Sequence, residues 1–224
     1  MKIGILVAMD KELKQLQKLF IHNNLQDSKS ANDVLVQKCG IGKVNAALGC
    51  QAMINSFHPD VIISSGCAGG NGQDVNPQDI IVGTQFTYHD VYCGLAIDNK
   101  TQYGQIQGLP ARYNADPRLL AAARKLSPRK EIKIHEGLIV TGDWFVDSKE
   151  KMASIIDKFH DAKAVDMESA AIAQTCYINN VPFISFRVIS DVPLKDTNAS
   201  QYHNFWETLA ENSFEITRTF VESL

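Results

Sequence analysis

The sequence has little of what a disulfide framework, a structural zinc site or a membrane span requires. Its 224 residues include only five cysteines, which are scattered without a Cys-x-x-Cys spacing. This pattern argues against a disulfide framework and a zinc site, and it is typical of a reducing compartment. No unbroken apolar stretch approaches the roughly 20 residues that span a bilayer.

An excess of positive charge is also missing. The 25 acidic residues outnumber the 22 basic residues, and the formal net charge is −3. A strongly cationic surface for nucleic acid is therefore not expected. The first residues form a strand-like run without a basic segment, an apolar signal region or a cleavage site. We expect a cytoplasmic protein that binds neither nucleic acid nor membranes.

Short apolar runs rich in Ile and Val alternate with polar, amphipathic segments along the chain. The runs predict strands over residues 2–9, 34–40, 60–67, 79–92, 137–143, 162–167 and 182–191. The segments predict helices over residues 10–20, 43–57, 116–126, 148–159, 168–178 and about 201–221. This alternation predicts an α/β fold on a largely parallel sheet. Without a low-complexity linker or a fixed repeat, residues 1–224 are expected to form one domain.

Several local signals refine these boundaries. Asp116 is expected to be a helix N-cap with Pro117 at the first helical position, and Ser148 is expected to open the next helix. The long strand over 79–92 is expected to bend or change partners near Gly83. Residues 68–72, AGGNG, are expected to form a glycine turn after the third strand.

Polar residues follow four of the predicted strands, and ligands of open α/β folds bind outside the carboxyl ends of strands. These residues are Glu12, Cys67, Glu168 and Asp191. Carboxylates that come from separate parts of the chain permit an acid and a base to converge, as general acid–base catalysis requires.

Each of these residues also has a structural explanation. In the first turn of a helix, Glu12 would favour the positive end of the helix dipole. A charge on Glu168 or Asp191 must be paired with an opposite charge, hydrated, or used in the function of the protein. Arg187 could pair with either residue. Cys67 has no histidine near it in the sequence, so packing or a passive site contact is favoured over nucleophilic chemistry.

Two other motifs carry weaker signals. Gly40–Lys43 is a tight strand-to-helix turn whose amides could face a ligand, but neither a Walker loop nor a Gly-x-Gly-x-x-Gly fingerprint is present. His89 and Asp90 are adjacent and would point to opposite faces of a strand, so a structural or rim role is favoured for each.

Seven segments, taken together, are characteristic of one family. In order they are MKIGILVAMDKEL, GIGKVNAALG, PDVIISSGCAGG, YHDV followed by YGQIQGLP, GLIVTGDWFV, AVDMESAAIAQ and PFISFRVISDV. Over nearly the whole chain they resemble the 5′-methylthioadenosine/S-adenosylhomocysteine nucleosidases, within the purine nucleoside phosphorylase superfamily. The resemblance implies a central mixed, largely parallel twisted sheet flanked by helices. It also implies hydrolysis of the N-ribosidic bond of thioadenosines, with no metal or organic cofactor.

The resemblance further implies a catalytic set. Asp191 matches the general acid that protonates adenine N7, and Ser190 orients it. Glu12 matches the carboxylate that activates water, and Arg187 matches the cation that helps to hold this water.

Substrate contacts follow from the same motifs. The resemblance implies that Glu168 accepts the ribose hydroxyls, that Met167 packs on the sugar, and that Phe145 and Val146 hold the adenine. Ile41 lines the thioalkyl pocket. The motifs add four further contacts with the substrate, which are Met9, Cys67, Ala68 and Gly69.

Family members are homodimers in which the partner chain closes the thioalkyl pocket. Tyr103 and Pro110, in the matching segment YGQIQGLP, are candidates for this contribution. We therefore expect a homodimer that binds a small nucleoside.

The chain departs from the family pattern at four places. Cys67 replaces the usual Ser, and Asp166 replaces the usual Glu before Met167. Residues 25–34 look too short for the usual strand pair, and they leave a single ordered strand. Residues 193–205 resemble an insertion over the adenine, where either Tyr202 or Phe205 could supply the aromatic lid.

Three other functions stay open at this point. A phosphorylase would use phosphate, but the first strand ends in Asp10 and Glu12, which would repel that anion. A hydrolase of another purine nucleoside, including futalosine-type substrates, would have different pocket walls. A nucleoside-binding protein without turnover would not need both an acid and a base.

Overall fold

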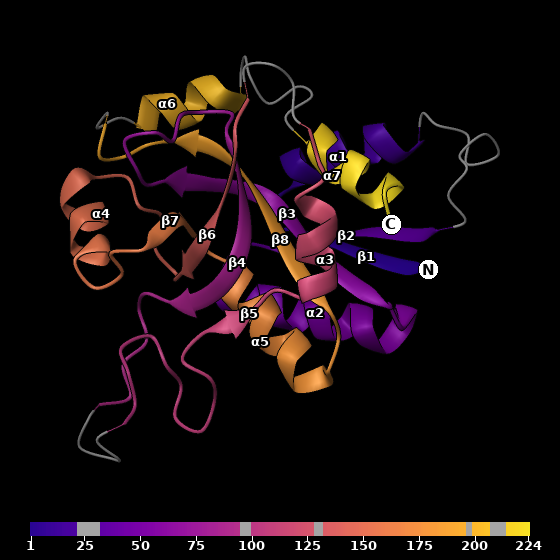
Figure 1. Cartoon of the computed structure of the whole chain (residues 1–224), viewed down its shortest axis with the longest axis horizontal. Helices are drawn as coiled ribbons and strands as arrows, with labels where there is room; N and C mark the ends of the chain where they lie inside the picture. The colour runs from indigo at the N-terminus through magenta and orange to yellow at the C-terminus, as the bar shows by residue number, and fades with distance from the viewer. Residues whose placement is uncertain (22–31, 95–99, 128–131, 196–198, 207–213) are drawn as a thin grey trace.

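The computed structural model describes residues 1–21, 32–94, 100–127, 132–195, 199–206 and 214–224. Eight strands form one mixed sheet, as expected (Figure 1). They are β1 (Lys2–Val7), β2 (Asp33–Lys38), β3 (Val61–Gly70), β4 (Ile80–Tyr88), β5 (Tyr113–Asn114), β6 (Ile134–Thr141), β7 (Ala162–Asp166) and β8 (Phe183–Asp191).

The strand pairing closes part of this sheet on itself. β3 pairs with β7 and β8, β4 pairs with β6 and β8, and β6 pairs with β7, so these five strands form a closed circuit. β1 lies beside β3 with β2 at its outer edge, and both pairings are parallel. The three antiparallel pairs are β3–β7, β4–β5 and β4–β8. The remaining five pairs are parallel, so the sheet is largely parallel.

Helices cover the sheet and bury its apolar side chains. They are α1 (Asp10–Ile21), α2 (Lys43–Phe57), α3 (Pro117–Ala123), α4 (Lys149–Ile156), α5 (Ser169–Asn179), α6 (Ala199–Asn204) and α7 (Glu215–Glu222). α2 packs against α5, and α1 packs against α7 (Figure 1). Met152 and Ile155 of α4 join the buried cluster that Leu138 of β6 and Val165 of β7 help to form. No helix in the described part of the chain is long and apolar enough to cross a membrane.

The predicted helix starts are confirmed. The Asp116 side chain accepts the amides of Arg118 and Leu119 before α3, and Pro117 is the first helical residue. The Ser148 hydroxyl accepts the amide of Lys151 at the start of α4. These bonds satisfy backbone donors that the first helical turn leaves without partners.

The irregularity predicted near Gly83 is also confirmed. The register of β4 against β6 shifts between Gly83 and Gln85. Residues 80–83 of β4 pair with β8 on the other side, whereas Gln85 and Phe86 pair with β5 there.

The predicted glycine turn at residues 68–72 is wrong at its beginning, because β3 continues through Gly70. Gly69 and Gly70 pair with Val165 and Ala164 of β7. A Cβ atom on Gly70 would lie 2.8 Å from a Val75 methyl and 2.9 Å from an Ile189 methyl. This glycine permits close packing within a strand, which a local turn signal does not distinguish from a chain reversal.

The tail that the sequence predicts to be helical from about residue 201 to residue 221 is helical at both of its ends in the described residues. The chain forms α6 and α7 as separate helices, and Phe214 precedes α7. Residues 207–213 lie outside the described residues. Residues 22–31 also lie outside the described residues, so the departure expected over residues 25–34 is tested only from residue 32 onward. The strand expected from residue 34 is β2, which begins at Asp33.

Candidate active site

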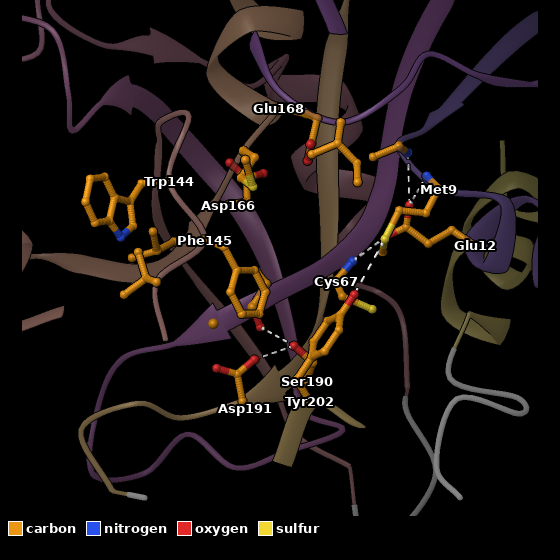
Figure 2. Close-up of a pocket in the computed structure, with 17 residues that line it drawn as sticks. Met9, Glu12, Cys67, Trp144, Phe145, Asp166, Glu168, Ser190, Asp191 and Tyr202 are labelled. Atoms are coloured by element: carbon orange, nitrogen blue, oxygen red, sulfur yellow. Dashed lines mark hydrogen bonds between the residues drawn. The ribbon is translucent and has the colours of Figure 1, made fainter. Parts of the chain in front are cut away.

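A cavity opens where the carboxyl ends of β1, β3, β7 and β8 meet (Figure 2). It is lined by Ala8, Met9, Glu12, Ile41, Cys67, Ala68, Gly69, Trp144, Phe145, Val146, Val165, Asp166, Met167, Glu168, Ser190, Asp191 and Tyr202. Four of these residues are carboxylates. Of the residues that the structure describes, those lining the cavity include no lysine, arginine or histidine.

Glu12 lies in the first turn of α1, but it does more than complement the helix dipole. Its Oε2 atom accepts the backbone amides of Ala8 and Met9 at 2.9 Å, and its Oε1 atom accepts the amide of Cys67 at 3.0 Å. The side chain is buried, and this burial raises the pKa of Glu12 against the opposing effects of Arg187 and the three amides. The residue is thus a fixed carboxylate that links the end of β1 to β3.

Arg187 forms a charge cluster behind the cavity wall. Its Nε atom donates to Asp166 Oδ2 at 2.7 Å, its Nη2 atom donates to the Ser64 hydroxyl at 2.8 Å, and Nη2 lies 3.9 Å from Glu168 Oε2. Burial alone would lower the pKa of Arg187, but its carboxylate neighbours outweigh burial and raise it. The guanidinium is therefore a permanent buried cation shared among carboxylates.

Gly66 brings this cation close to Glu12. A Cβ atom on Gly66 would lie 2.8 Å from Glu12 Oε1 and closer still to Arg187 Nη1. Only a residue without a side chain leaves room for both groups on this stretch of β3. Of the two partners that the sequence left open for Arg187, the described structure pairs it with Glu168 and not with Asp191, and its other ion pair is with Asp166.

Glu168 stands directly before α5 and faces the cavity. Its Oε1 atom accepts the backbone amide of Gly42 at 3.0 Å. Burial, followed by the nearby Asp166 carboxylate, raises the pKa of Glu168 to about 8, and Arg187 opposes this effect. The amide of Gly42, which the sequence suggested could face a ligand, is therefore engaged with a site residue.

Asp191 ends β8 beside Ser190. The Ser190 hydroxyl donates to Asp191 Oδ1 at 2.6 Å, and this hydroxyl also lies 3.3 Å from the Ala68 carbonyl. Burial raises the pKa of Asp191 to about 6, although the Ser190 hydrogen bond acts in the opposite direction. A carboxyl group that titrates in this range can hold a proton near neutral pH and release it during a reaction.

Aromatic side chains form another part of the cavity wall. The rings of Phe145 and Tyr202 meet edge to face with centroids 5.2 Å apart, and the Tyr202 hydroxyl lies 3.5 Å from Met9 Sδ (Figure 2). Phe205 is fully buried and does not line the cavity. Between the two residues that the sequence left open as an aromatic lid, the structure therefore brings Tyr202 to the site.

The cavity brings together all of the predicted site residues except three. Arg187 lies behind the wall, as described above. Tyr103 stacks on Tyr92 with ring centroids 5.7 Å apart, and neither Tyr103 nor the half-buried Pro110 lines the cavity. A contribution of these two residues to a partner chain remains a prediction.

Four lining residues were missed by the sequence reasoning: Ala8, Trp144, Val165 and Asp166. All four are sequence neighbours of predicted residues in the same motifs, and this adjacency could have identified them. Tyr202 comes from α6 and has no local signal that distinguishes it from Phe205.

Cys67 is a lining residue whose thiol is poorly suited to nucleophilic attack. Burial, followed by the Glu12 carboxylate, raises the pKa of Cys67 well above its usual value. Because the thiolate is the nucleophilic form, this environment favours the passive contact over the nucleophile. No group of His, Cys, Asp and Glu side chains within the described ranges could hold a metal ion.

Comparison with known proteins identifies the class to which this fold and cavity belong. Residues 2–222 match the family model of the phosphorylase superfamily. The chain is also similar to the 5′-methylthioadenosine/S-adenosylhomocysteine nucleosidase of an Exiguobacterium species, with 36% identity over all of this chain and 99% of the relative.

Solved structures agree with this match. The Neisseria meningitidis nucleosidase in complex with methylthio-immucillin-A has a TM-score of 0.88 and 33% identity, over 100% of this chain and 99% of that one. A Colwellia psychrerythraea nucleosidase in complex with adenine has a TM-score of 0.87 and 33% identity, over 100% and 96%. The chain belongs to the 5′-methylthioadenosine/S-adenosylhomocysteine nucleosidase family. It is an enzyme of the N-ribosyl hydrolase class.

Proposed function

We propose that the protein hydrolyses the N-ribosidic bond of 5′-methylthioadenosine, S-adenosylhomocysteine or both, and releases adenine and the thioribose. The observation that carries this proposal is a cavity lined by four carboxylates and, among the described residues, by no cationic side chain. Such a lining would repel phosphate but accepts water and a neutral nucleoside. The names and bound ligands of the similar proteins support the same substrate class.

Asp191 is the proposed general acid. The bond to adenine breaks with difficulty because the leaving group would carry a negative charge, and a proton on N7 removes that charge. With its pKa raised to about 6, Asp191 holds a proton far more readily than an exposed carboxyl group. The Ser190 hydrogen bond keeps the carboxyl group in one orientation.

Glu12 is the proposed base that accepts a proton from the attacking water. Burial raises the pKa of Glu12, and the adjacent Arg187 and three backbone amides oppose this effect by favouring the ionised form that a base requires. Water oxygen then bonds to the anomeric carbon as the bond to adenine breaks, and the water proton passes to Glu12. Since Arg187 lies behind the wall, we assign it to the electrostatic support of the carboxylates.

Glu168 and Met167 are the proposed contacts with the ribose. One Glu168 oxygen accepts the Gly42 amide, which leaves the other oxygen for the sugar hydroxyls. The ribosyl centre becomes cation-like as the bond to adenine breaks, and Glu168 stabilises that charge when it is ionised.

The apolar part of the cavity is the proposed binding site for the base and the thioalkyl group. Phe145 and Val146 would hold adenine under Tyr202, and Met9 and Ile41 would contact the thioalkyl end.

We further propose a homodimer. Large apolar side chains are exposed along α2 and α5, namely Val44, Leu48, Tyr177 and Ile178. A second copy would cover them, and its Tyr103 and Pro110 would close the thioalkyl pocket. All five cysteines are free, which is consistent with the cytoplasm as the place of action.

A substrate panel in phosphate-free buffer tests the proposed reaction. Purified protein should release adenine from 5′-methylthioadenosine or S-adenosylhomocysteine without added phosphate. Release only in the presence of phosphate would indicate a phosphorylase, and binding without release would indicate a non-catalytic protein. Turnover of inosine or futalosine in preference to thioadenosines would indicate another purine nucleoside as the substrate.

A further inference from the structure

Three charged residues outside the cavity join segments that are far apart in the sequence. Lys43 begins α2, Asp90 follows β4 and Asp143 follows β6. Nζ of Lys43 donates to both carboxylate oxygens of Asp90 at 2.8 Å and lies 3.8 Å from Asp143 Oδ2. We call these three residues the Lys43 clamp. Burial alone would raise the pKa of Asp90, but the bonds from Lys43 and from the Asp143 amide outweigh burial and lower it.

Two backbone hydrogen bonds give the clamp its geometry. The amide of Lys43 donates to Asp143 Oδ1 at 2.7 Å, and the amide of Asp143 donates to Asp90 Oδ2 at 2.8 Å. Each segment is therefore tied to the next by its main chain as well as by charge. Hydrogen bonds between an ionised acceptor and a backbone amide are among the stronger ones in proteins.

Glycines allow these segments to approach so closely. Gly42 has φ +91°, and a Cβ atom there would lie 2.8 Å from Asp143 Oδ1. A Cβ atom on Gly142 would lie 2.8 Å from Asp90 Cγ and would overlap the His89 ring. His89 is buried, and neither of its ring nitrogens has a hydrogen-bond partner in the described structure. The ring acts here as packing under Gly142.

The joined segments carry different parts of the cavity wall. Ile41 lines the cavity beside Gly42, whose amide binds Glu168 Oε1 at 3.0 Å. Phe145 and Val146 line the cavity shortly after Asp143. None of the three clamp residues is itself among the lining residues.

We propose that Lys43, Asp90 and Asp143 are positioning residues that hold the ribose side and the adenine side of the site at a fixed separation. This proposal rests on the proposed function, which assigns Glu168 to ribose and Phe145 to adenine. The clamp touches neither Glu12 nor Asp191, so it acts on nucleoside binding and not on proton transfer. Binding energy lost equally from the ground state and the transition state raises KM and leaves kcat unchanged.

The test compares Asp143→Ala, Asp143→Asn and Lys43→Met with the wild type. Asp143→Ala and Lys43→Met should raise KM for 5′-methylthioadenosine and Kd for adenine, measured by calorimetric titration, about fivefold to tenfold. Their kcat should stay within about twofold of the wild-type value. Asp143→Asn keeps an oxygen acceptor for the Lys43 amide, and it should restore most of the affinity lost in Asp143→Ala.

Glu136→Ala is the matched control. It removes the partner of Arg124: Glu136 lies on β6, Arg124 follows α3, and Glu136 Oε2 and Arg124 Nη2 lie 2.8 Å apart. Neither residue lines the cavity. The KM and Kd of this control should equal those of the wild type. The Asp143 side chain is 46% exposed, so Asp143→Ala should fold and have a melting temperature close to that of the control.

Three results would contradict the proposed positioning role of the Lys43 clamp. These are an unchanged adenine affinity in Asp143→Ala and Lys43→Met, a fall in kcat at constant KM, or no recovery in Asp143→Asn. Failure of the proposed function is distinguishable, because the wild type would then bind adenine without releasing it from any thioadenosine. The adenine titrations would still decide the clamp in that case.

Discussion

Ser190 donates a hydrogen bond of 2.6 Å to Asp191, the residue that follows it at the end of β8. Burial and this hydrogen bond have opposite effects on the pKa of Asp191. Burial raises the pKa of Asp191 to about 6, whereas the Ser190 hydroxyl stabilises the ionised carboxylate and keeps the pKa from rising further. The proposed acid is thus tuned by its neighbour in sequence.

The pH profile of Ser190→Ala should reveal this tuning. If protonated Asp191 is required, wild-type kcat/KM falls about tenfold per pH unit above a pH of about 6. Without the Ser190 bond, the pKa of Asp191 is higher, so the fall should begin at a higher pH. Because the carboxyl group also loses its fixed orientation, the maximal rate should be lower. A descending limb that stays at the wild-type pH would contradict the tuning.

Asp191→Asn should exchange activity for stability. The folded pKa of Asp191 lies about two units above its ordinary value, so folding favours the protonated form. The protonated carboxyl group of Asp191 contributes to the stability of the folded protein below about pH 4, and this contribution is lost as the pH rises through about 6. At pH 8, the free energy of unfolding of Asp191→Asn should therefore exceed that of the wild type by about 2–3 kcal/mol, and the variant should unfold at a higher temperature. At pH 4 this difference should be absent.

The same variant should lose about 100-fold or more of its turnover, because an amide cannot supply the proton. Thermal unfolding at the two pH values and adenine release are the measurements. Near-wild-type turnover would refute the role of Asp191 as the acid.

Glu12→Gln should abolish hydrolysis at a modest cost in stability. Both Glu12 oxygens accept backbone amides, and the NH2 group of Gln must face at least one of these donors. A buried donor left without a partner costs about 1–3 kcal/mol. Chemical denaturation should show this loss, and circular dichroism should show an intact fold. Substantial residual turnover would exclude Glu12 as the base.

Cys67→Ser should keep or improve activity. The bond from residue 67 to Glu12 comes from the backbone amide, so it survives a change of side chain. A hydroxyl group is also a better hydrogen-bond donor than a thiol in a cavity that must position water and ribose. Steady-state kinetics are the measurement. Loss of activity would show that the thiol has a role of its own.

Arg187→Met should destabilise the protein by about 3–5 kcal/mol, because it leaves Asp166 buried without its cation. Arg187→Met combined with Asp166→Asn should recover part of this loss. The exposed pair of Arg124 and Glu136 gives the control, since Arg124→Met should cost less than about 1 kcal/mol. Equal losses in the two single variants, measured by denaturant unfolding, would contradict the role of the buried cluster.

Much of the fold can be predicted from local sequence patterns, and the predictions that failed have a common cause. The N-caps Asp116 and Ser148 are predictable because a cap is a contact between near neighbours in the chain. The role of Gly70 is not predictable, because the need for a glycine at this position comes from close packing against Val75 and Ile189. In the same way, Tyr202 and Phe205 look equivalent in sequence, and packing buries one and exposes the other to the cavity.

The sequence by itself determined that Glu12, Glu168 and Asp191 reach the cavity, because carboxylates placed after apolar strands mark the rim of a sheet. It also determined the family, through seven motifs in order. Only the tertiary structure decided that the pKa values of Glu12, Glu168 and Asp191 are raised, since pKa values depend on burial and on charges from distant segments. It placed Arg187 behind the wall, engaged the Gly42 amide with Glu168, and joined Lys43 to Asp90 and Asp143. These contacts link segments far apart in the chain, and no local pattern encodes which of them come together.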